Sequence, residues 1–286
     1  MTDGILYVVA TPIGNRDDLS QRARQVLGDV QLIASEDTRR TGRLLAHFGI
    51  DAQQLALHEH NEAEASVRIL EMLAGGQSVA LVSDAGTPLI SDPGYRLLRL
   101  AHEHGAKVSP IPGPSALIAA LSVAGLATDR FCFEGFLPAK RAARRTQLEA
   151  LRGETRTLVF YEAVHRIHDM LSDVRDIFGA ERKAFIGREL SKLHEQCVLA
   201  DLANLIAMLE AASIPSKGEF VVVVEGAAAA SLSASLDVDA LLLKLAPLMP
   251  QKQAVDIVAA VSKERRNDLY RRMLELTGKT RADETS

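Results

Sequence analysis

Leu81-Val-Ser-Asp-Ala-Gly-Thr-Pro-Leu-Ile-Ser-Asp-Pro-Gly94 is the stretch that decides the fold, because an apolar segment runs directly into a polar loop. The apolar segment Ser78–Val82 is typical of a buried strand, and a helix is expected to begin near Tyr95. Ligands of α/β proteins bind just beyond the carboxyl ends of such strands, where glycine and short side chains let the backbone come close. From composition alone, the Ser83–Gly94 loop is either a ligand loop or a long turn with a helix N-cap.

Similar segments on either side of this loop predict an α/β architecture. Apolar runs rich in β-branched residues alternate with patterns that place apolar side chains on one face of a helix. Strands are expected at Ile5–Ala10, Val30–Ala34, Val79–Val82 and Lys107–Ile111. Helices are expected at Asp17–Gly28, Arg40–Phe48, Glu62–Ala74 and Tyr95–His104. This alternation predicts a mostly parallel sheet that is covered on both faces.

The proline-rich segment Pro110–Pro114 separates this unit from a second α/β unit, because proline restricts the backbone of its own residue and of the one before it. Strands of the second unit are expected at Phe131–Phe133, Thr157–Tyr161, Ala184–Arg188 and Phe220–Val224. Its helices are expected at Ser115–Val123, Arg141–Leu151, Val164–Phe178 and Leu202–Ala212. The first domain is therefore predicted to span residues 1–114, and the second residues 115–228.

The composition changes after Gly226, where alanine and serine indicate a linker. A small helical unit follows, which completes a third region predicted at residues 229–286. Its helices are expected at Ala240–Leu245, Lys252–Val261 and Asn267–Leu276. The polar tail from Thr280 is expected to be disordered.

Length and composition are those of an ordinary globular protein of about two domains: 286 residues, 47% hydrophobic and 24% charged. Two cysteines without a CxxC partner, Cys132 and Cys197, exclude a disulfide framework or a zinc knuckle and fit a reducing compartment. No apolar run approaches the roughly 20 residues of a membrane span, and the N-terminus lacks the basic segment of a secretory signal, so a cytoplasmic protein is expected. A net charge of −4 argues against broad coating of nucleic acid but allows local basic patches.

Two other strands end in loops that contain proline and glycine, Ala10–Asn15 and Pro112–Ser115. Both are expected at the same sheet edge as the Ser83–Gly94 loop. Neither matches the G-x-G-x-x-G or P-loop pattern, which disfavours a dinucleotide or nucleoside triphosphate site. Free N–H groups at the start of the helix after Pro114 suit a carboxylate or a hydroxyl, although Ser115 is equally plausible as an N-cap alone.

Several blocks together resemble the tetrapyrrole methylase family, over roughly residues 5 to 226. The blocks are Val9–Asn15, Ser35–Arg39, His58–Glu62, Ser83–Gly94, Pro112–Ala116, Phe160–Ala163, Gly187–Lys192 and Lys217–Phe220. The resemblance implies two α/β domains of the tetrapyrrole methylase type, a cleft between them that binds S-adenosylmethionine, and homodimers. The match is close to the branch that methylates the ribose 2′-oxygen of a cytidine, cytidine 1402 in the family, in the decoding region of 16S rRNA.

The resemblance also implies which residues contact the cofactor. They are Pro12, Ala85, Gly86, Thr87, Ile90, Ser115, Ala116, Tyr161, Glu162, Gly218 and Glu219. The family's common Gly-Asp-Pro is Gly86-Thr87-Pro88 here, so either Thr87 or Asp84 takes the place of the family's aspartate. Contacts of the Ala85–Ile90 segment are expected to be mainly through its backbone. Replacement of Gly86 by a larger residue is therefore expected to abolish cofactor binding and to leave the fold intact.

Methyl transfer from a sulfonium needs no metal, because an in-line displacement depends mainly on alignment of the two reacting groups. A ribose hydroxyl is a weak acid, so a nearby base should help, and Asp84 or Glu36 is the expected base. An ion pair or a helix cap is an equally good interpretation of either carboxylate. His58 and His60 are weak evidence for a metal without a third ligand, and no metal is expected.

Basic residues indicate where RNA would bind. Candidate contacts are Arg39, Arg40, Lys140, Arg141, Arg144, Arg145 and Arg188, with a solvated helix face as the alternative. Lys263, Arg265, Arg266, Arg271 and Arg272 in the C-terminal unit suit a helix-turn-helix-like contact with RNA, although such a unit equally suits dimerisation.

The resemblance implies 16S rRNA as the partner. The net negative charge suits a composite surface, such as the small ribosomal subunit or an assembly intermediate, better than free RNA. Two other functions stay open: methylation of a tetrapyrrole ring, and a non-catalytic assembly factor that binds the cofactor only as a ligand.

Overall fold

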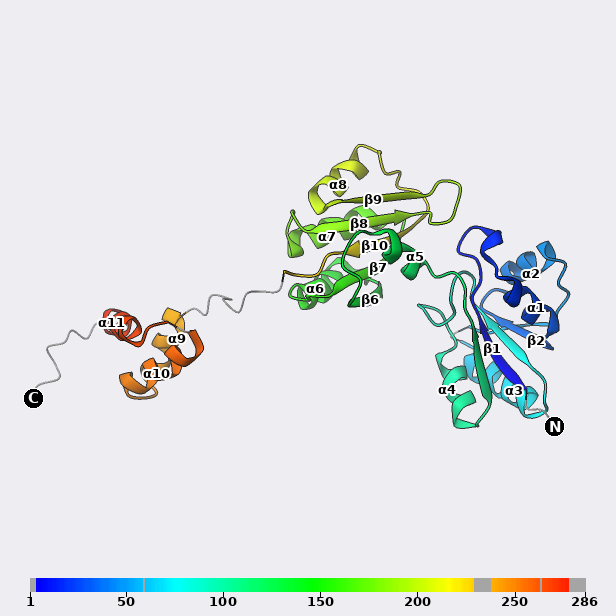
Figure 1. The fold of residues 1–286 in the computed structure, drawn as a ribbon, viewed down its shortest axis with the longest axis horizontal. Helices are drawn as coiled ribbons and strands as arrows, with labels where there is room; N and C mark the ends of the chain where they lie inside the picture. The colour runs from blue at the N-terminus through cyan, green and yellow to red at the C-terminus, as the bar shows by residue number, and fades with distance from the viewer. Residues whose placement is uncertain (1–3, 59, 229–237, 263, 278–286) are drawn as a thin grey trace, which may run out of the picture. The chain divides into compact units, whose positions relative to one another are not determined.

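The computed structural model describes residues 4–58, 60–228, 238–262 and 264–277, and the chain divides into two compact units, residues 1–227 and 228–286 (Figure 1). Among the described helices, none combines the length and the apolar character needed to cross a membrane.

The first unit begins with a five-stranded parallel sheet in the order β3-β2-β4-β1-β5. Its strands are β1 (Ile5–Val9), β2 (Leu32–Ser35), β3 (Gln54–Ala56), β4 (Val79–Val82) and β5 (Lys107–Ile111). Its helices are α1 (Gln21–Asp29), α2 (Thr38–His47), α3 (Glu62–Ala74) and α4 (Tyr95–Glu103). Side chains of α1 and α2 pack on one face and those of α3 and α4 on the other, which explains why β2 and β4 are buried throughout and are apolar except for Ser35.

The second half of this unit contains a mixed sheet in the order β6-β7-β10-β8-β9. Its strands β6 and β7 pair in parallel, and the other neighbouring strands pair antiparallel. Its strands are β6 (Phe131–Phe136), β7 (Thr157–Ala163), β8 (Lys183–Arg188), β9 (Gln196–Asp201) and β10 (Glu219–Val224). Its helices are α5 (Ala116–Val123), α6 (Arg141–Leu151), α7 (Ile167–Phe178) and α8 (Leu202–Glu210). Helices α6, α7 and α8 cover one face. Helix α5 covers the other face, where Ile13 and Ile90 of the first half also pack (Figure 1).

The second unit contains α9 (Val238–Leu245), α10 (Gln251–Ser262) and α11 (Arg266–Thr277). Their apolar side chains, including Leu242, Val255, Val258, Leu269 and Met273, form a core of their own. Most of the expected linker lies at residues 229–237, which are outside the described residues. The expected tail and Lys263 are also outside the described residues.

The α/β fold and most elements agree with the sequence-based expectation, with three physical differences. The expected helix Asp17–Gly28 is broken into a 3-10 helix, Arg16–Asp18, and α1, because the Ser20 hydroxyl accepts a hydrogen bond from the Ala23 amide at 3.1 Å and starts a new helix there. Strands β3 and β9 were not expected. Both lie at sheet edges, where partly exposed residues give no apolar run.

Candidate active site

A cavity of about 450 Å³ opens between the two halves of the first unit. In the first half, its walls come from the segments that follow β1, β2, β4 and β5. In the second half, they come from the carboxyl ends of β6 and β7, the start of β10, and β8 with the segment that follows it. Its volume lies in the range of about 300–1,000 Å³ that is usual for small-molecule sites. Most predicted site residues line it, namely Glu36, Arg40, Asp84, Ala85, Gly86, Thr87, Ile90, Ser115, Ala116, Tyr161, Glu162 and Glu219.

Hydrogen bonds tie together the loops that follow β1, β4 and β5. The Thr11 amide donates to the Gly86 carbonyl at 2.8 Å, and the Gly86 amide donates back to the Thr11 carbonyl at 3.0 Å. The Thr87 hydroxyl donates to the Pro114 carbonyl at 3.0 Å, which joins the third loop. Gly86 has a φ of +82°, a conformation that glycine adopts without steric cost. The three loops therefore form one interlocked wall.

Strained backbone gathers around the same cavity. Leu89 and Ser91 have φ values of 74° and 71°, and Glu189 and Ser191 on the other half have 51° and 63°. Residues other than glycine rarely adopt this left-handed backbone conformation. It costs about 1–3 kcal/mol per residue and is typical of functional sites. Ile90, between the first two, and Lys192, just after the others, both line the cavity.

Three carboxylates line the first-half side of the cavity: Glu36, Asp84 and Asp92. Asp84 is held at both oxygens, since Oδ1 accepts a hydrogen bond from the Asp37 amide at 3.0 Å and Oδ2 lies 3.3 Å from Arg40 Nη1. Burial raises the pKa of Asp92 to about 6, helped by the nearby charges of Glu36 and Asp84 and opposed by a hydrogen bond with Ser83.

Asp92 is not among the predicted site residues, because Ser-Asp-Pro-Gly is also an ordinary turn sequence. The feature of the sequence that could have identified Asp92 is its position in the same strand-end loop as Asp84.

Glu162 and Tyr161 at the end of β7 form part of the opposite wall. The Tyr161 hydroxyl accepts a hydrogen bond from the Leu117 amide at 3.1 Å, which ties β7 to α5. Glu162 is buried, and its Oε1 accepts a hydrogen bond from the Ala163 amide at 2.8 Å. Burial raises the pKa of Glu162, and the positive charge of Arg166 opposes this effect. Its Oε2 has no hydrogen-bond partner among the described residues, and Arg166 Nε lies 3.3 Å from Oε1.

Two predicted cofactor residues, Pro12 and Gly218, do not line this cavity. Pro12 lines a smaller neighbouring cavity. Gly218 has a φ of +93°, and a Cβ there would lie 2.4 Å from Glu189 Cδ. Gly218 therefore allows the close approach of the Glu189 side chain, whose Oε1 accepts a hydrogen bond from the Glu219 amide at 2.9 Å.

The predicted RNA contacts differ in their surroundings. Arg40 lines the cavity. Arg39 is exposed and pairs with Asp37 at 2.8 Å, outside the cavity lining. Lys140 is exposed at the start of α6. Arg188 is buried, and its guanidinium donates to the carbonyls of Lys217 at 2.6 Å and His194 at 2.9 Å. The expectation that Arg188 contacts RNA is therefore wrong, because its donors hold two loops together.

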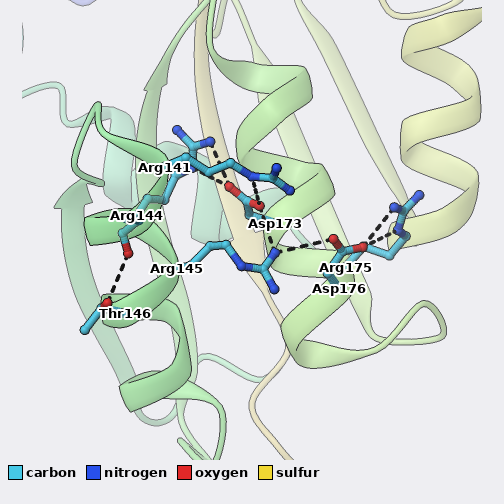
Figure 2. A network of polar contacts seen from close by, with 8 residues as sticks. Arg141, Arg144, Arg145, Thr146, Asp173, Arg175 and Asp176 are labelled. Carbon is cyan, nitrogen blue, oxygen red and sulfur yellow. Dashed lines mark hydrogen bonds and ion pairs between the residues drawn. The ribbon is translucent and has the colours of Figure 1, made fainter.

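Figure 2 shows that Arg141, Arg144 and Arg145 converge on one carboxylate, Asp173 of α7. Nitrogen–oxygen distances to Asp173 are 3.0 Å for Arg141, 2.7 Å for Arg144 and 2.9 Å for Arg145. Burial alone raises the pKa of Asp173, but the hydrogen bonds from these arginines outweigh it and lower the pKa. Arg144 is only 3% exposed, so its expected role as a phosphate contact is wrong. Contacts of Arg141 and Arg145 with RNA stay predictions.

No group of three potential metal ligands occurs among the described residues, and His58 and His60 do not form part of one. The rings of these two histidines pack edge to face, with centroids 6.0 Å apart.

Comparison with known proteins identifies the class. The family model described as Tetrapyrrole (Corrin/Porphyrin) Methylases matches residues 5–206, and a model described as RsmI C-terminal HTH domain matches residues 233–277. The chain belongs to the tetrapyrrole methylase family.

The relatives are similar over their full length. A protein of Pseudomonas aeruginosa named ribosomal RNA small subunit methyltransferase I is 51% identical, and the match covers 98% of this chain and 100% of the relative. A protein of Escherichia coli O157:H7 with the same name is 48% identical, with 97% of each chain covered.

Among solved structures, a uroporphyrin-III C-methyltransferase from Thermus thermophilus complexed with S-adenyl homocysteine has a TM-score of 0.55 and 17% identity, covering 78% of this chain and 97% of that chain. A likeness at this identity shows the fold alone.

We predict that Asp173→Ala lowers the free energy of unfolding by about 3–5 kcal/mol, because it leaves the buried Arg144 guanidinium without a counter-ion. Asp176→Ala is the matched control. That carboxylate lies on the same helix and 3.4 Å from Arg145, but it is 37% exposed, so a loss under about 1 kcal/mol is expected. Urea denaturation of both variants measures the difference, and equal losses would contradict the structural role of the cluster.

Proposed function

We propose that this chain is an S-adenosylmethionine-dependent methyltransferase that acts in the cytoplasm on the ribose 2′-oxygen of a cytidine in the decoding region of 16S rRNA. The observation that carries the proposal is the match of whole chains: relatives about half identical along their full length bear the name ribosomal RNA small subunit methyltransferase I. The resemblance of the sequence blocks to one branch of the family supports the nucleoside and the atom. The substrate is 16S rRNA within the small subunit, and the active form is a homodimer.

The cavity fits S-adenosylmethionine in size and in chemistry. Its lining combines apolar side chains, such as Ile13 and Ile90, with carboxylates. The carboxylates suit the positive charge and the hydroxyl groups of the ligand. Ala85–Ile90, Ser115, Ala116, Tyr161, Glu162 and Glu219 would hold the cofactor. When bound, it supplies the methyl group from its sulfonium.

The three carboxylates have different roles in this proposal. Both Asp84 oxygens are engaged by the Asp37 amide and Arg40, so Asp84 positions the α2 start and Arg40. Asp92 is the better candidate for the base, because a carboxylate whose pKa is near 6 accepts a proton more readily near neutral pH than an ordinary one. Glu36 lies close enough to raise that pKa. The expected base thus moves from Asp84 or Glu36 to Asp92.

Methylation of small ribosomal subunits tests the proposed function. Subunits from a strain that lacks this enzyme are incubated with the purified chain and methyl-labelled S-adenosylmethionine. One ribose methyl group at a cytidine of the decoding region is expected for each subunit. Label elsewhere in the rRNA, or none, would contradict the proposal. Turnover with a porphyrinoid and not with subunits would favour methylation of a tetrapyrrole instead.

Gly86→Val should abolish cofactor binding, because a Cβ would lie 3.3 Å from Ile13 Cγ2, at the wall of the cavity where the cofactor must approach the loop. It should also destabilise the fold by about 1–2 kcal/mol, because Gly86 has a φ of +82°. This stability loss revises the expectation that the fold stays intact.

Gly105→Val is the matched control for Gly86→Val, since Gly105 has a φ of +68° and a Cβ there would meet nothing within 4 Å. It precedes β5, at the sheet edge away from the cavity. Calorimetric titration should show loss of binding for Gly86→Val alone. Normal binding by that variant would refute the assignment of this loop.

Activity should fall as the pH drops through about 6, because the base is active only when ionised. Asp92→Asn should lower kcat by about 10²–10⁴-fold and remove this acid limb. Glu36→Gln removes a nearby negative charge, so it should move the limb to lower pH. The pH dependence of kcat with saturating subunits measures both effects. An acid limb unchanged in Asp92→Asn would exclude Asp92 as the base.

A further inference from the structure

A second cavity, of about 220 Å³, adjoins the cavity described above. The two share a wall, because Ile13, Arg40, Asp84, Ala85, Lys192 and Glu219 line both of them. The second cavity is smaller than the usual range for a whole small-molecule ligand. It therefore suits one group of a larger molecule that also occupies the first cavity.

Three cationic side chains from separate segments line the second cavity: Arg16, Arg40 and Lys192. Lys192 Nζ is already paired, at 2.7 Å from Glu189 and 2.9 Å from Glu219. Arg40 pairs once, with Asp84 at 3.3 Å, and its side chain is 60% exposed.

Arg16 is different, because it forms no ion pair with a carboxylate among the described residues. Its Nη1 lies 3.2 Å from the ring Nδ1 of His47, so most of its guanidinium donors stay available. Asp17 and Asp18 follow it in the sequence but do not line the cavity.

The segment that carries Arg16 is held in place before any ligand binds. Asn15 caps the 3-10 helix, since its side-chain Oδ1 accepts a hydrogen bond from the Asp17 amide at 3.1 Å. The Asn15 amide in turn lies 3.3 Å from the Ser191 hydroxyl of the other half. Gly14 packs against Lys192, where a Cβ would lie 2.2 Å from Lys192 Cγ. A cation on this segment is thus pre-organised beside the shared wall.

We propose that the second cavity binds the phosphodiester on the 3′ side of the methylated ribose, with Arg16 as the main contact and Arg40 as a second. The argument rests on the proposed function and adds a subsite to it. In RNA the 2′-oxygen and the 3′-phosphate are on neighbouring carbons of one ribose. A site that presents the 2′-oxygen to the first cavity must therefore accommodate an anion close by. Arginine binds phosphate through paired, charge-assisted hydrogen bonds.

Arg16→Gln tests the proposal in the full-length protein, with undermethylated small subunits and S-adenosylmethionine as substrates. One lost phosphate contact should raise the KM for subunits roughly five- to tenfold at low salt. It should also lower the slope of log affinity against log salt by about 0.7–0.9. The Kd for S-adenosylmethionine should change less than twofold. Arg16→Lys, which keeps the charge, should restore the salt dependence.

Arg68→Gln is the matched control, because Arg68 is exposed on α3 and lines neither cavity. It should behave as the wild type in both measurements. An unchanged KM for subunits in Arg16→Gln would overturn the proposal. Weaker cofactor binding with unchanged subunit binding would overturn it too, and would assign the cavity to the carboxylate of the cofactor. Absence of methylation by the wild type would refute the proposed function itself.

Discussion

Two reciprocal backbone hydrogen bonds, between Thr11 and Gly86, hold the site together at the edge of the first sheet. They join the loops after β1 and β4, which neighbour each other in the sheet. The Thr11 hydroxyl adds a third link, to the Ser83 carbonyl at 3.1 Å. Because Gly86 has a positive φ, the loop turns sharply there and leaves Ala85, Thr87 and the residues after them along the cavity. The turn thereby positions the part of the cavity wall that this loop supplies.

Charge is distributed unevenly around the shared wall. Carboxylates gather in the larger cavity, where Asp92 is protonated more readily than an ordinary aspartate. Arg40 and Lys192 line both cavities, whereas Arg16 lines the smaller one and lacks an acidic partner among the described residues. The Arg40–Asp84 ion pair lines both cavities.

The sequence predicted the α/β fold and most of the cavity, because buried parallel strands are continuous apolar runs and the loops after them carry glycine and proline. The predicted role of a side chain was wrong where the group that it binds comes from another part of the chain. Arg144 looks like a solvent-facing cation until Asp173, on another helix, is brought against it. Arg188 is similar, since the carbonyls that it binds belong to loops folded beside it. Asp92 was not predicted as a site residue, because its raised pKa depends on burial and on the charge of Glu36, which the local sequence does not reveal.

Hydrogen–deuterium exchange of the full chain, with and without S-adenosylmethionine, tests whether the cofactor binds in the larger cavity. In the proposed function, the cofactor lies against residues 83–92 and 115–118, the end of β7 and the start of β10. Slower exchange is therefore expected in these segments, with no change in α9, α10 and α11. Protection confined to the C-terminal helices, or binding without protection of residues 83–92, would contradict the account.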